Sequence, residues 1–194
     1  PLDNQNPVFS NDASLLLPVN ALGHEYLLMT GSGGGAYVTI VGTKSETEVT
    51  VTVTNDTELG PGVPALAKGE SLTRTIGAGE VLSLKATQVA GVLDNLTGTH
   101  VMASKNVVVF GGNVAANTAD RCCADHLEQQ MFPLSSWGTT FVATKSKPRW
   151  EENDHWRILA AEDGTKVTFS GGASNPIILD RGGYFDLESL MDFV

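Results

Sequence analysis

The residues best suited to chemistry lie in one short stretch, Cys122-Cys123-Ala124-Asp125-His126. Cys122 and Cys123 are the only cysteines among the 194 residues of the chain, and they are adjacent. A thiolate activated by an imidazole is the pair that cysteine nucleophiles use, and both groups also bind zinc. These residue types therefore allow three chemistries to be considered: disulfide formation, metal binding and nucleophilic catalysis.

Adjacent cysteines cannot join distant parts of a chain, so the two thiols do not form a disulfide framework. Three states remain open for Cys122 and Cys123. They form a vicinal disulfide in an oxidising compartment, they pack as small reduced hydrophobic side chains, or they bind a metal with Asp125 or His126. Zinc sites usually separate their cysteines by about two to four residues, which argues against the third state.

Carboxylates flank the cysteines, and a short helix is predicted over residues 124–131. Carboxylates near the start of a helix accept hydrogen bonds from its free amide groups, so we interpret Asp120, Asp125 and His126 as a helix-capping motif. Catalysis by Cys123 would need a contacting base and an oxyanion site, which a sequence does not show. We expect no catalytic site, no metal site and no cofactor.

The stretch Gly31–Ala36 has the glycine spacing of a dinucleotide-binding turn. Such a turn must lead into a helix whose N-terminus holds the pyrophosphate. Residues 37–41, Tyr-Val-Thr-Ile-Val, follow instead, and their composition is typical of a strand. The stretch therefore predicts a hairpin loop.

A second candidate site is the charged loop over residues 145–154. Loops on a rigid β-scaffold often carry binding residues, and Trp and Arg are favoured anchors at interfaces. The candidate binding residues are Arg149, Trp150, Glu151, Asp154 and Trp156. A solvated loop with Trp150 folded back onto the sheet is the alternative.

The elements that would position these residues are strands. Residues 48–54 alternate Val with Thr or Glu, which is the period-two pattern of a half-buried strand. Many short segments of this kind, separated by Gly, Pro and Asn clusters, indicate an all-β sandwich or barrel. The predicted strands are 37–41, 48–54, 81–84, 100–102, 106–110, 140–144, 155–160, 166–169 and 177–179.

The strand pattern recurs within the chain. Three pairs of segments match, with offsets of 115, 118 and 103: 17–27 with 132–142, 47–51 with 165–169, and 81–84 with 184–187. Matches that keep their order indicate a repeat. We predict two related antiparallel β-sandwich-like units, residues 1–118 and 132–194, joined by a Cys-Cys loop and short helix over 119–131.

The second unit is expected to be incomplete. In the first unit, residues 94–110 follow the segment 81–84 and add strand-like sequence, whereas the chain ends at Val194 before an equivalent. Either the chain is a fragment or another chain supplies the missing strand, because an apolar edge is normally covered. The chain starts with Pro1 and carries no initiator Met, so we favour a processed or excised fragment.

Composition excludes some partners. The chain has 22 acidic and 12 basic residues, a net charge of −10, which repels nucleic-acid phosphates. Only 18% of residues are charged, and Thr, Ser, Asn and Gly dominate the polar remainder, as is common in extracellular β-proteins. No apolar run approaches the roughly 20 residues that span a bilayer, so no transmembrane segment is expected.

Several segments together resemble one family. The segments are Thr97–Asn113, Cys122–Gln130, Trp137–Phe141 and Ile158–Val167. They are similar to segments of the N-terminal domain family of IgGFc-binding protein, over roughly residues 17–190, with Asn106 where a proline is expected. The resemblance implies binding or adhesion at a mucosal or cell surface, without naming a ligand.

These observations predict a non-catalytic binding or adhesion module of a larger protein that is secreted or lies at the cell surface. Its expected partner is a protein or glycan ligand on a surface. The alternative is a structural subunit that assembles with neighbouring copies of itself into a surface layer or filament by strand exchange. A metal-dependent hydrolase is a third, disfavoured interpretation.

Overall fold

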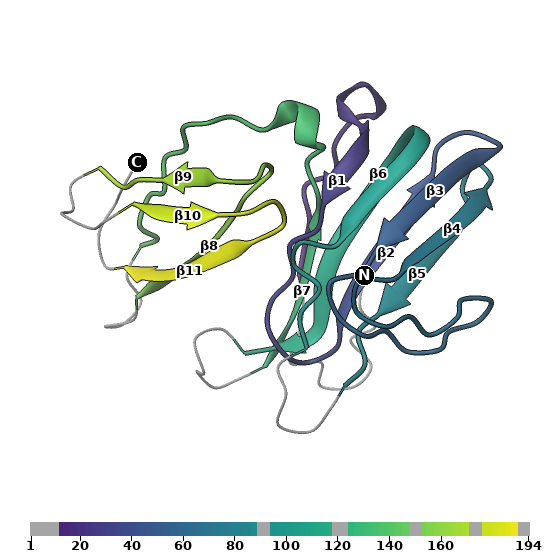
Figure 1. The fold of residues 1–194 in the computed structure, drawn as a ribbon, viewed down its shortest axis with the longest axis horizontal. Helices are drawn as coiled ribbons and strands as arrows, with labels where there is room; N and C mark the ends of the chain where they lie inside the picture. Colours follow the sequence, from purple (N-terminus) through teal and green to yellow (C-terminus); the bar gives the residue numbers. More distant parts are fainter. Residues whose placement is uncertain (1–11, 89–93, 118–123, 148–152, 171–175, 190–194) are drawn as a thin grey trace. The chain divides into compact units, whose positions relative to one another are not determined.

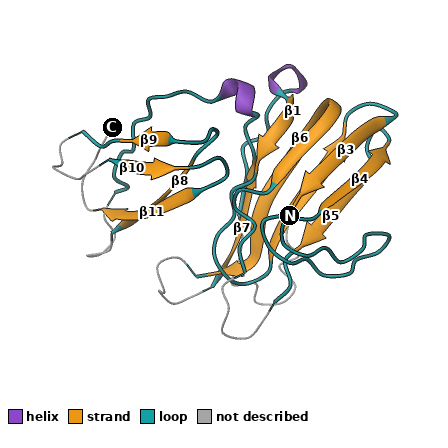
Figure 2. Ribbon diagram, in the orientation of Figure 1, coloured by secondary structure: helices purple, strands orange, loops and turns teal. Residues whose placement is uncertain are grey.

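A computed structural model describes residues 12–88, 94–117, 124–147, 153–170 and 176–189 (Figure 1). The chain divides into two compact units, residues 1–135 and 136–194, called the first and the second unit below. Every regular element of the described residues is a β-strand or a 3-10 turn (Figure 2), and every strand pair is antiparallel. The all-β class is therefore confirmed. None of the described segments forms a helix long and apolar enough to cross a membrane.

The first unit contains a seven-stranded sheet that curls into a nearly closed barrel. Its strands are β1 (Gly23–Leu27), β2 (Ala36–Gly42), β3 (Thr47–Thr52), β4 (Ser71–Ile76), β5 (Val81–Lys85), β6 (His100–Ala116) and β7 (Asp125–Gln130). Two 3-10 turns, η1 (Val19–Ala21) and η2 (Leu134–Ser136), precede β1 and follow β7. The order of neighbours is β4-β3-β6-β2-β5, and β1 and β7 each pair with β6.

Strand β6 holds this sheet together. It is 17 residues long, so its first half pairs with β1 and β3 while its second half pairs with β2 and β7. The β2–β5 pair and the β3–β4 pair are connected in the sheet only through β6. Loss of the central strand would therefore separate the β3–β4 pair from the β2–β5 pair and leave β1 and β7 without a partner strand in this sheet.

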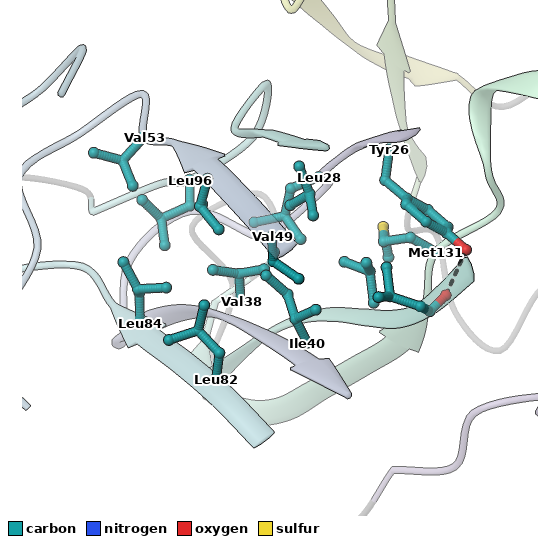
Figure 3. Close-up of a cluster of buried hydrophobic side chains, with 14 of the residues drawn as sticks. Tyr26, Leu28, Val38, Ile40, Val49, Val53, Leu82, Leu84, Leu96 and Met131 are labelled. Carbon is teal, nitrogen blue, oxygen red and sulfur yellow. Dashed lines mark hydrogen bonds between the residues drawn. The ribbon is translucent and has the colours of Figure 1, made fainter. Parts of the chain in front are cut away.

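The core of the first unit lies on one face of this curled sheet. Val38 and Ile40 of β2 lie beside Leu82 and Leu84 of β5, and all four are buried (Figure 3). Alternation places every second residue of each strand on this face. Burial of such apolar side chains contributes most of the free energy of folding.

Tyr26 of β1 places a hydroxyl inside the core. The buried hydroxyl donates to the Val107 carbonyl at 2.7 Å and accepts from the Gly23 amide at 2.8 Å. Desolvation raises the pKa of Tyr26, partly offset by the hydrogen bond with Gly23. The two hydrogen bonds compensate the desolvation of the hydroxyl and fix β1 on β6.

The prediction of a helix over residues 124–131 is wrong, because residues 125–130 form strand β7. The run from Leu127 to Gln130 pairs with β6 from Asn113 back to Phe110. Leu, Glu and Gln favour helices in isolation, but β6 offers an open edge that satisfies the backbone of this segment as a strand. Met131 then enters the core at 8% exposure.

Because no helix forms here, the interpretation of Asp125 and His126 as helix-capping residues is also wrong. Asp125 begins a strand, and its Oδ1 accepts a hydrogen bond from the adjacent His126 amide at 2.8 Å. Asp120 lies outside the described residues. Among described residues, therefore, the Asp-His pair belongs to a sheet edge and not to a helix start.

The second unit contains two separate two-stranded antiparallel sheets (Figure 1). Strand β8 (Asp154–Leu159) pairs with β11 (Tyr184–Ser189), and β9 (Thr165–Val167) pairs with β10 (Ile177–Leu179). The strand predicted over 140–144 does not form. Between these two sheets the described residues supply no joining strand.

Candidate binding site

The predicted site residues fall into two groups. Six of them lie outside the described residues: Asp120, Cys122, Cys123, Arg149, Trp150 and Glu151. The predicted disulfide between Cys122 and Cys123 therefore also lies outside the described residues. Asp125 and His126 lie on β7 of the first unit, whereas Asp154 and Trp156 lie on β8 of the second. The structure therefore offers two places to examine, one in each unit.

In the first unit, His126 packs against an aromatic ring. It stacks on Tyr37 of β2, with ring centroids 6.1 Å apart and an interplanar angle of 17°. The Tyr37 hydroxyl lies 3.5 Å from His126 Nε2 and donates to the Leu127 carbonyl at 3.3 Å. Burial raises the pKa of Tyr37 to about 12, and the negative charges of Glu128 and Asp12 add to the rise. The neutral hydroxyl is thus a structural donor at neutral pH.

The close approach of β7 to Tyr37 depends on a glycine. A Cβ at Gly112 would lie 2.0 Å from the Leu127 carbonyl oxygen and 2.6 Å from the Tyr37 hydroxyl. Any side chain there would displace the strand or the ring. The Asp-His segment thus serves packing in this unit, and sequence reasoning missed Tyr37 because it lies 89 residues before His126.

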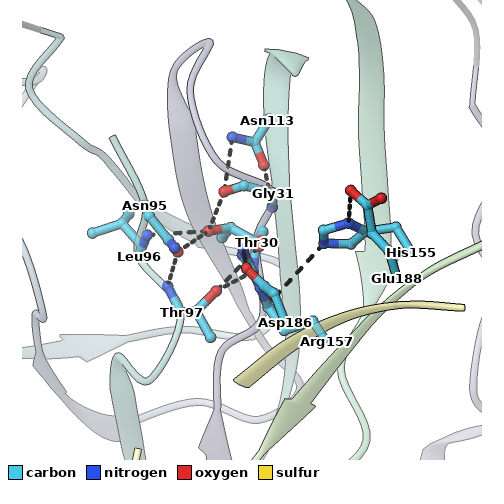
Figure 4. Close-up of polar contacts among 10 residues, drawn as sticks. All are labelled: Thr30, Gly31, Asn95, Leu96, Thr97, Asn113, His155, Arg157, Asp186 and Glu188. Carbon is cyan, nitrogen blue, oxygen red and sulfur yellow. Dashed lines mark hydrogen bonds and ion pairs between the residues drawn. The ribbon is translucent and has the colours of Figure 1, made fainter. Parts of the chain in front are cut away.

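The glycine loop that precedes β2 is held by a buried side chain. Asn113 of β6 accepts from the Gly31 amide at 2.6 Å and donates to the Gly31 carbonyl at 3.3 Å (Figure 4). Its amide nitrogen also donates to the Gly33 carbonyl at 2.6 Å. Gly34 has φ +68, and a Cβ there would lie 1.2 Å from the Ala115 carbonyl oxygen. The glycines therefore permit close contact with β6, and strand β2 follows the loop directly, as predicted.

Thr30 extends the polar contacts on the other side of this loop. Its hydroxyl donates to Asn95 Oδ1 at 3.0 Å and accepts from the Leu96 amide at 3.1 Å, and its carbonyl accepts from the Thr97 hydroxyl at 3.1 Å (Figure 4). These contacts fix the chain that leads into β6. Buried polar groups that are satisfied in this way rigidify a fold.

In the second unit, charged and aromatic side chains gather on one face of β8 and β11. This charged face consists of His155, Arg157, Tyr184, Asp186 and Glu188. The register of the two strands brings these side chains together. Arg157 pairs with Asp186 and His155 pairs with Glu188, and residues two apart on a strand share a face. Sequence reasoning missed it because the two strands are about 30 residues apart and only their register brings the charges together.

Arg157 is the centre of the charged face. Its Nε and Nη2 donate to the two carboxylate oxygens of Asp186, each at 2.7 Å (Figure 4), and its guanidinium carbon lies 4.4 Å from the Tyr184 ring centroid. The side chain is 10% exposed. Hydrogen bonds from Arg157 lower the pKa of Asp186, against a smaller opposing effect of burial. A bidentate pair of this kind has a fixed orientation.

His155 adds a titratable group beside this pair. Its Nε2 lies 3.7 Å from Asp186 Oδ1 and its Nδ1 lies 4.0 Å from Glu188 Oε1 (Figure 4). Two carboxylates thus flank one imidazole. No group of three His, Cys, Asp or Glu side chains in the described part of the chain has a metal-binding arrangement.

The opposite face of the same two strands is apolar. Trp156 and Ile158 of β8 pair with Leu187 and Phe185 of β11. All four are only partly buried. Trp156, predicted as a binding residue of the charged loop, therefore lies on the apolar face and not among the charges.

The base of the predicted binding loop is closed by Asp154. Its Oδ2 accepts a hydrogen bond from the Ser146 amide at 2.7 Å. Residues 148–152 of the loop are outside the described residues. The loop leads directly into β8, so Asp154 ties the start of the loop to the strand that carries the charged face.

The sequence matches one family over most of its length. Residues 12–194 match the family model described as IgGFc binding protein. The chain belongs to the IgGFc-binding protein family. The resemblance based on the Cys-Cys-Ala-Asp-His segment and its companions is therefore confirmed.

A curated relative supports the assignment. The human IgGFc-binding protein is 28% identical to this member of the IgGFc-binding family over 185 residues. The match covers 91% of this chain but only 3% of the human protein, so the chain spans a small part of that relative. No solved structure matches the chain.

Asn106, where the IgGFc-binding resemblance suggested a proline, lies at an irregular step of β6. The ladder with β3 ends at Ala103 and the ladder with β2 begins at Val107, so Asn106 lies between them. Its Nδ2 donates to the Leu22 carbonyl at 3.0 Å. Strands tolerate proline at such interruptions, and here an amide side chain occupies the position and bonds the backbone before β1.

Proposed function

We propose that this chain is a non-catalytic protein-binding module of a larger protein that is secreted or lies at the cell surface. The observation that carries the proposal is the family match over residues 12–194, together with a relative that is named for binding the Fc part of immunoglobulin G. The chain corresponds to 3% of that relative, so the proposal concerns one small part of a larger protein. Adhesion at a surface follows from such binding.

The charged face of the second unit is the proposed contact surface. Tyr is a frequent anchor in protein interfaces, and Tyr184 is 39% exposed. Arg157, whose side chain is only 10% exposed, holds Asp186 and the Tyr184 ring in place. A side chain that is ordered before binding loses less entropy on binding. Glu188 and Asp186, with 45% and 35% of their side chains accessible, offer acceptors to a partner.

The predicted binding loop adjoins this face along the chain. The loop over 145–154 ends at Asp154, which begins β8, and it carries Arg149 and Trp150. A large contact would combine the loop with the charged face. Interfaces of stable complexes bury about 800 Å² on each partner, which is more than one strand pair presents.

The test is a binding assay on the purified chain. The probes are immunoglobulin G Fc and a panel of purified secreted glycoproteins. Saturable binding of each probe is measured by biolayer interferometry. We expect Arg157→Ala and Tyr184→Ala to weaken the binding about tenfold or more, which corresponds to about 1.4 kcal/mol. Arg74→Ala is the control, because Arg74 is an exposed arginine of the first unit whose guanidinium donates to the Gly62 carbonyl.

Two results would contradict the proposal. The first is the absence of saturable binding to every probe. The second is binding that Arg157→Ala and Arg74→Ala affect equally, because the charged face would then make no specific contribution.

A further inference from the structure

The two units contain strand pairs with the same register. Adding 118 to the residue numbers of β2 and 103 to those of β5 converts every pair of the β2–β5 ladder into a pair of the β8–β11 ladder. The pairs of the β2–β5 ladder are Tyr37–Lys85, Val38–Leu84, Thr39–Ser83, Ile40–Leu82 and Val41–Val81. In the same order, the corresponding pairs of the β8–β11 ladder are His155–Glu188, Trp156–Leu187, Arg157–Asp186, Ile158–Phe185 and Leu159–Tyr184.

The same two offsets relate the other strand pairs. In the β3–β4 ladder, the pairs concerned are Thr47–Ile76, Glu48–Thr75 and Val49–Arg74. In the same order, the corresponding pairs of the β9–β10 ladder are Thr165–Leu179, Lys166–Ile178 and Val167–Ile177. A slip of one residue would move every side chain to the other face of its strand. Agreement of the register in both ladders therefore points to one fold present twice.

We infer that the second unit is a copy of the first without its central strand, and that a strand of the same polypeptide, following β11 as β6 follows β5, completes it. In the first unit β6 lies between β3 and β2. The corresponding position, between β9 and β8, holds no strand of the described residues. The expected occupant is an extended segment that pairs with β8 on one side and with β9 on the other.

Burial in the two copies supports the missing strand. Val38, Ile40, Leu82 and Leu84 are at most 5% exposed in the first unit. Their counterparts in the second unit are equally apolar but only partly buried: Trp156, Ile158, Phe185 and Leu187. The second unit thus has the side chains of a core without the element that covers them.

The segment before β8 gives a second, independent indication. Strand β1 pairs only with β6 in the first unit, and there Tyr26 and Leu27 are 0% and 2% exposed. At an offset of 115, their counterparts are Phe141 and Val142, which are 66% and 69% exposed and lie in no strand. Among the described residues, the counterpart of β1 forms no strand, as expected if its one partner strand is missing.

The order of the first unit argues for a strand from the same polypeptide. Residues 86–99 connect β5 to β6 in the first unit. At the β5-to-β11 offset of 103, the completing strand would occupy positions 203–219 of a longer chain. It should alternate apolar and polar residues, with apolar side chains at the counterparts of Val101, Val107 and Val109, which are fully buried in β6.

The first experiment compares the 194-residue chain with the natural polypeptide extended to about position 220. Hydrogen exchange is measured by mass spectrometry on peptides from β8 and β9. We expect the extension to slow exchange in both strands about tenfold or more while the molecule stays monomeric, because their open backbone groups gain partners. A control extension carries two prolines in the added strand and should give the exchange of the shorter chain, because proline cannot donate to a ladder.

A second, engineered chain tests the position between β9 and β8 without the natural extension. Residues 86–116 are appended directly after Glu188, the counterpart of Lys85, so that a second β6 follows β11. The matched control carries Val107→Pro and Val109→Pro in the appended copy alone. Protection of β8 and β9 is expected with the appended strand and not with the control.

Other outcomes overturn the inference. Protection that grows with protein concentration and accompanies dimers of the 194-residue chain would mean that a second copy occupies the position. Exchange that is unchanged by both additions would mean that β8 and β9 take no strand between them. Neither result depends on a ligand, so the inference and the proposed function can fail separately.

Discussion

The β2–β5 pair and the β8–β11 pair share a register but differ on both of their faces. On the outer face, the neutral hydroxyl contact of Thr39 with Ser83, at 3.0 Å, is replaced by the bidentate pair of Arg157 with Asp186. On the opposite face, apolar side chains are buried in the first unit and only partly buried in the second. Register therefore does not depend on a completed core, whereas burial does.

The difference separates two roles of a strand pair. In the first unit, β7 covers the outer position of Tyr37 through His126, and β6 completes the sheet. In the second unit, the corresponding position is His155, which faces Asp186 and Glu188. One scaffold thus supports a packed strand pair in one place and a charged surface in the other.

The largest expected effect comes from matched core truncations. Ile40→Ala should lower the free energy of unfolding of the first unit by about 2–5 kcal/mol, because it leaves a cavity among fully buried side chains. Its register counterpart, Ile158→Ala, should cost about 1 kcal/mol or less, because Ile158 is partly exposed. Urea unfolding, followed in each unit by hydrogen exchange, measures both values. Equal costs would show that the two inner faces are equally buried.

A glycine pair should give the next largest effect. Gly112→Ala should destabilise the first unit by about 2–3 kcal/mol, because its Cβ would lie 2.0 Å from a backbone oxygen. Gly138→Ala is the control in the second unit, since the nearest atom there is 3.9 Å away, and it should change stability by less than about 0.5 kcal/mol. Thermal unfolding measures both. A neutral Gly112→Ala would argue against close packing of β7 on β6.

The pKa of Tyr37 predicts a loss of stability at high pH in the first unit. Burial, with the charges of Glu128 and Asp12, raises the folded pKa from 10.0 to about 12. The folded state thus favours the protonated hydroxyl, so the contribution is complete below pH 10 and is lost as pH rises toward 12. Tyr37→Phe should remove one late step from the phenolate absorbance titration. An unchanged titration would contradict the assignment.

The smallest effect is expected at Asp186 in acid. Hydrogen bonds from Arg157 lower its folded pKa, so its contribution is present above the unfolded value of about 4 and is lost as pH falls through the folded value. About a third of the side chain is exposed, so screening limits the effect to less than about 1 kcal/mol. Asp186→Asn should flatten the acid side of the stability profile of the second unit, with Ser83→Ala as the control in the first.

Period-two patterns predicted most of the strands correctly. The alternation at 37–41, 48–54, 81–84 and 155–160 corresponds to β2, β3, β5 and β8. The segments 100–102 and 106–110 merge into the single strand β6. Strand alternation is a local property, so a single sequence shows it without knowledge of the fold.

Two predictions failed where a distant partner decides the structure. Residues 124–131 carry helix-forming side chains, yet the open edge of β6 makes them a strand. Residues 140–144 carry a strand pattern, yet they form no strand. Their counterpart β1 pairs only with β6, and the described residues of the second unit offer no such strand.

The all-β class, the positions of most strands and the family could be predicted from the amino-acid sequence. These depend on alternation, turn residues and short motifs, each contained within a few neighbouring residues. The contacts of Arg157 with Asp186, of His126 with Tyr37 and of Asn113 with the glycine loop became evident only from the folded chain. The partners in these contacts lie 29 to 89 residues apart, and strand register, which no local pattern states, brings them within bonding distance.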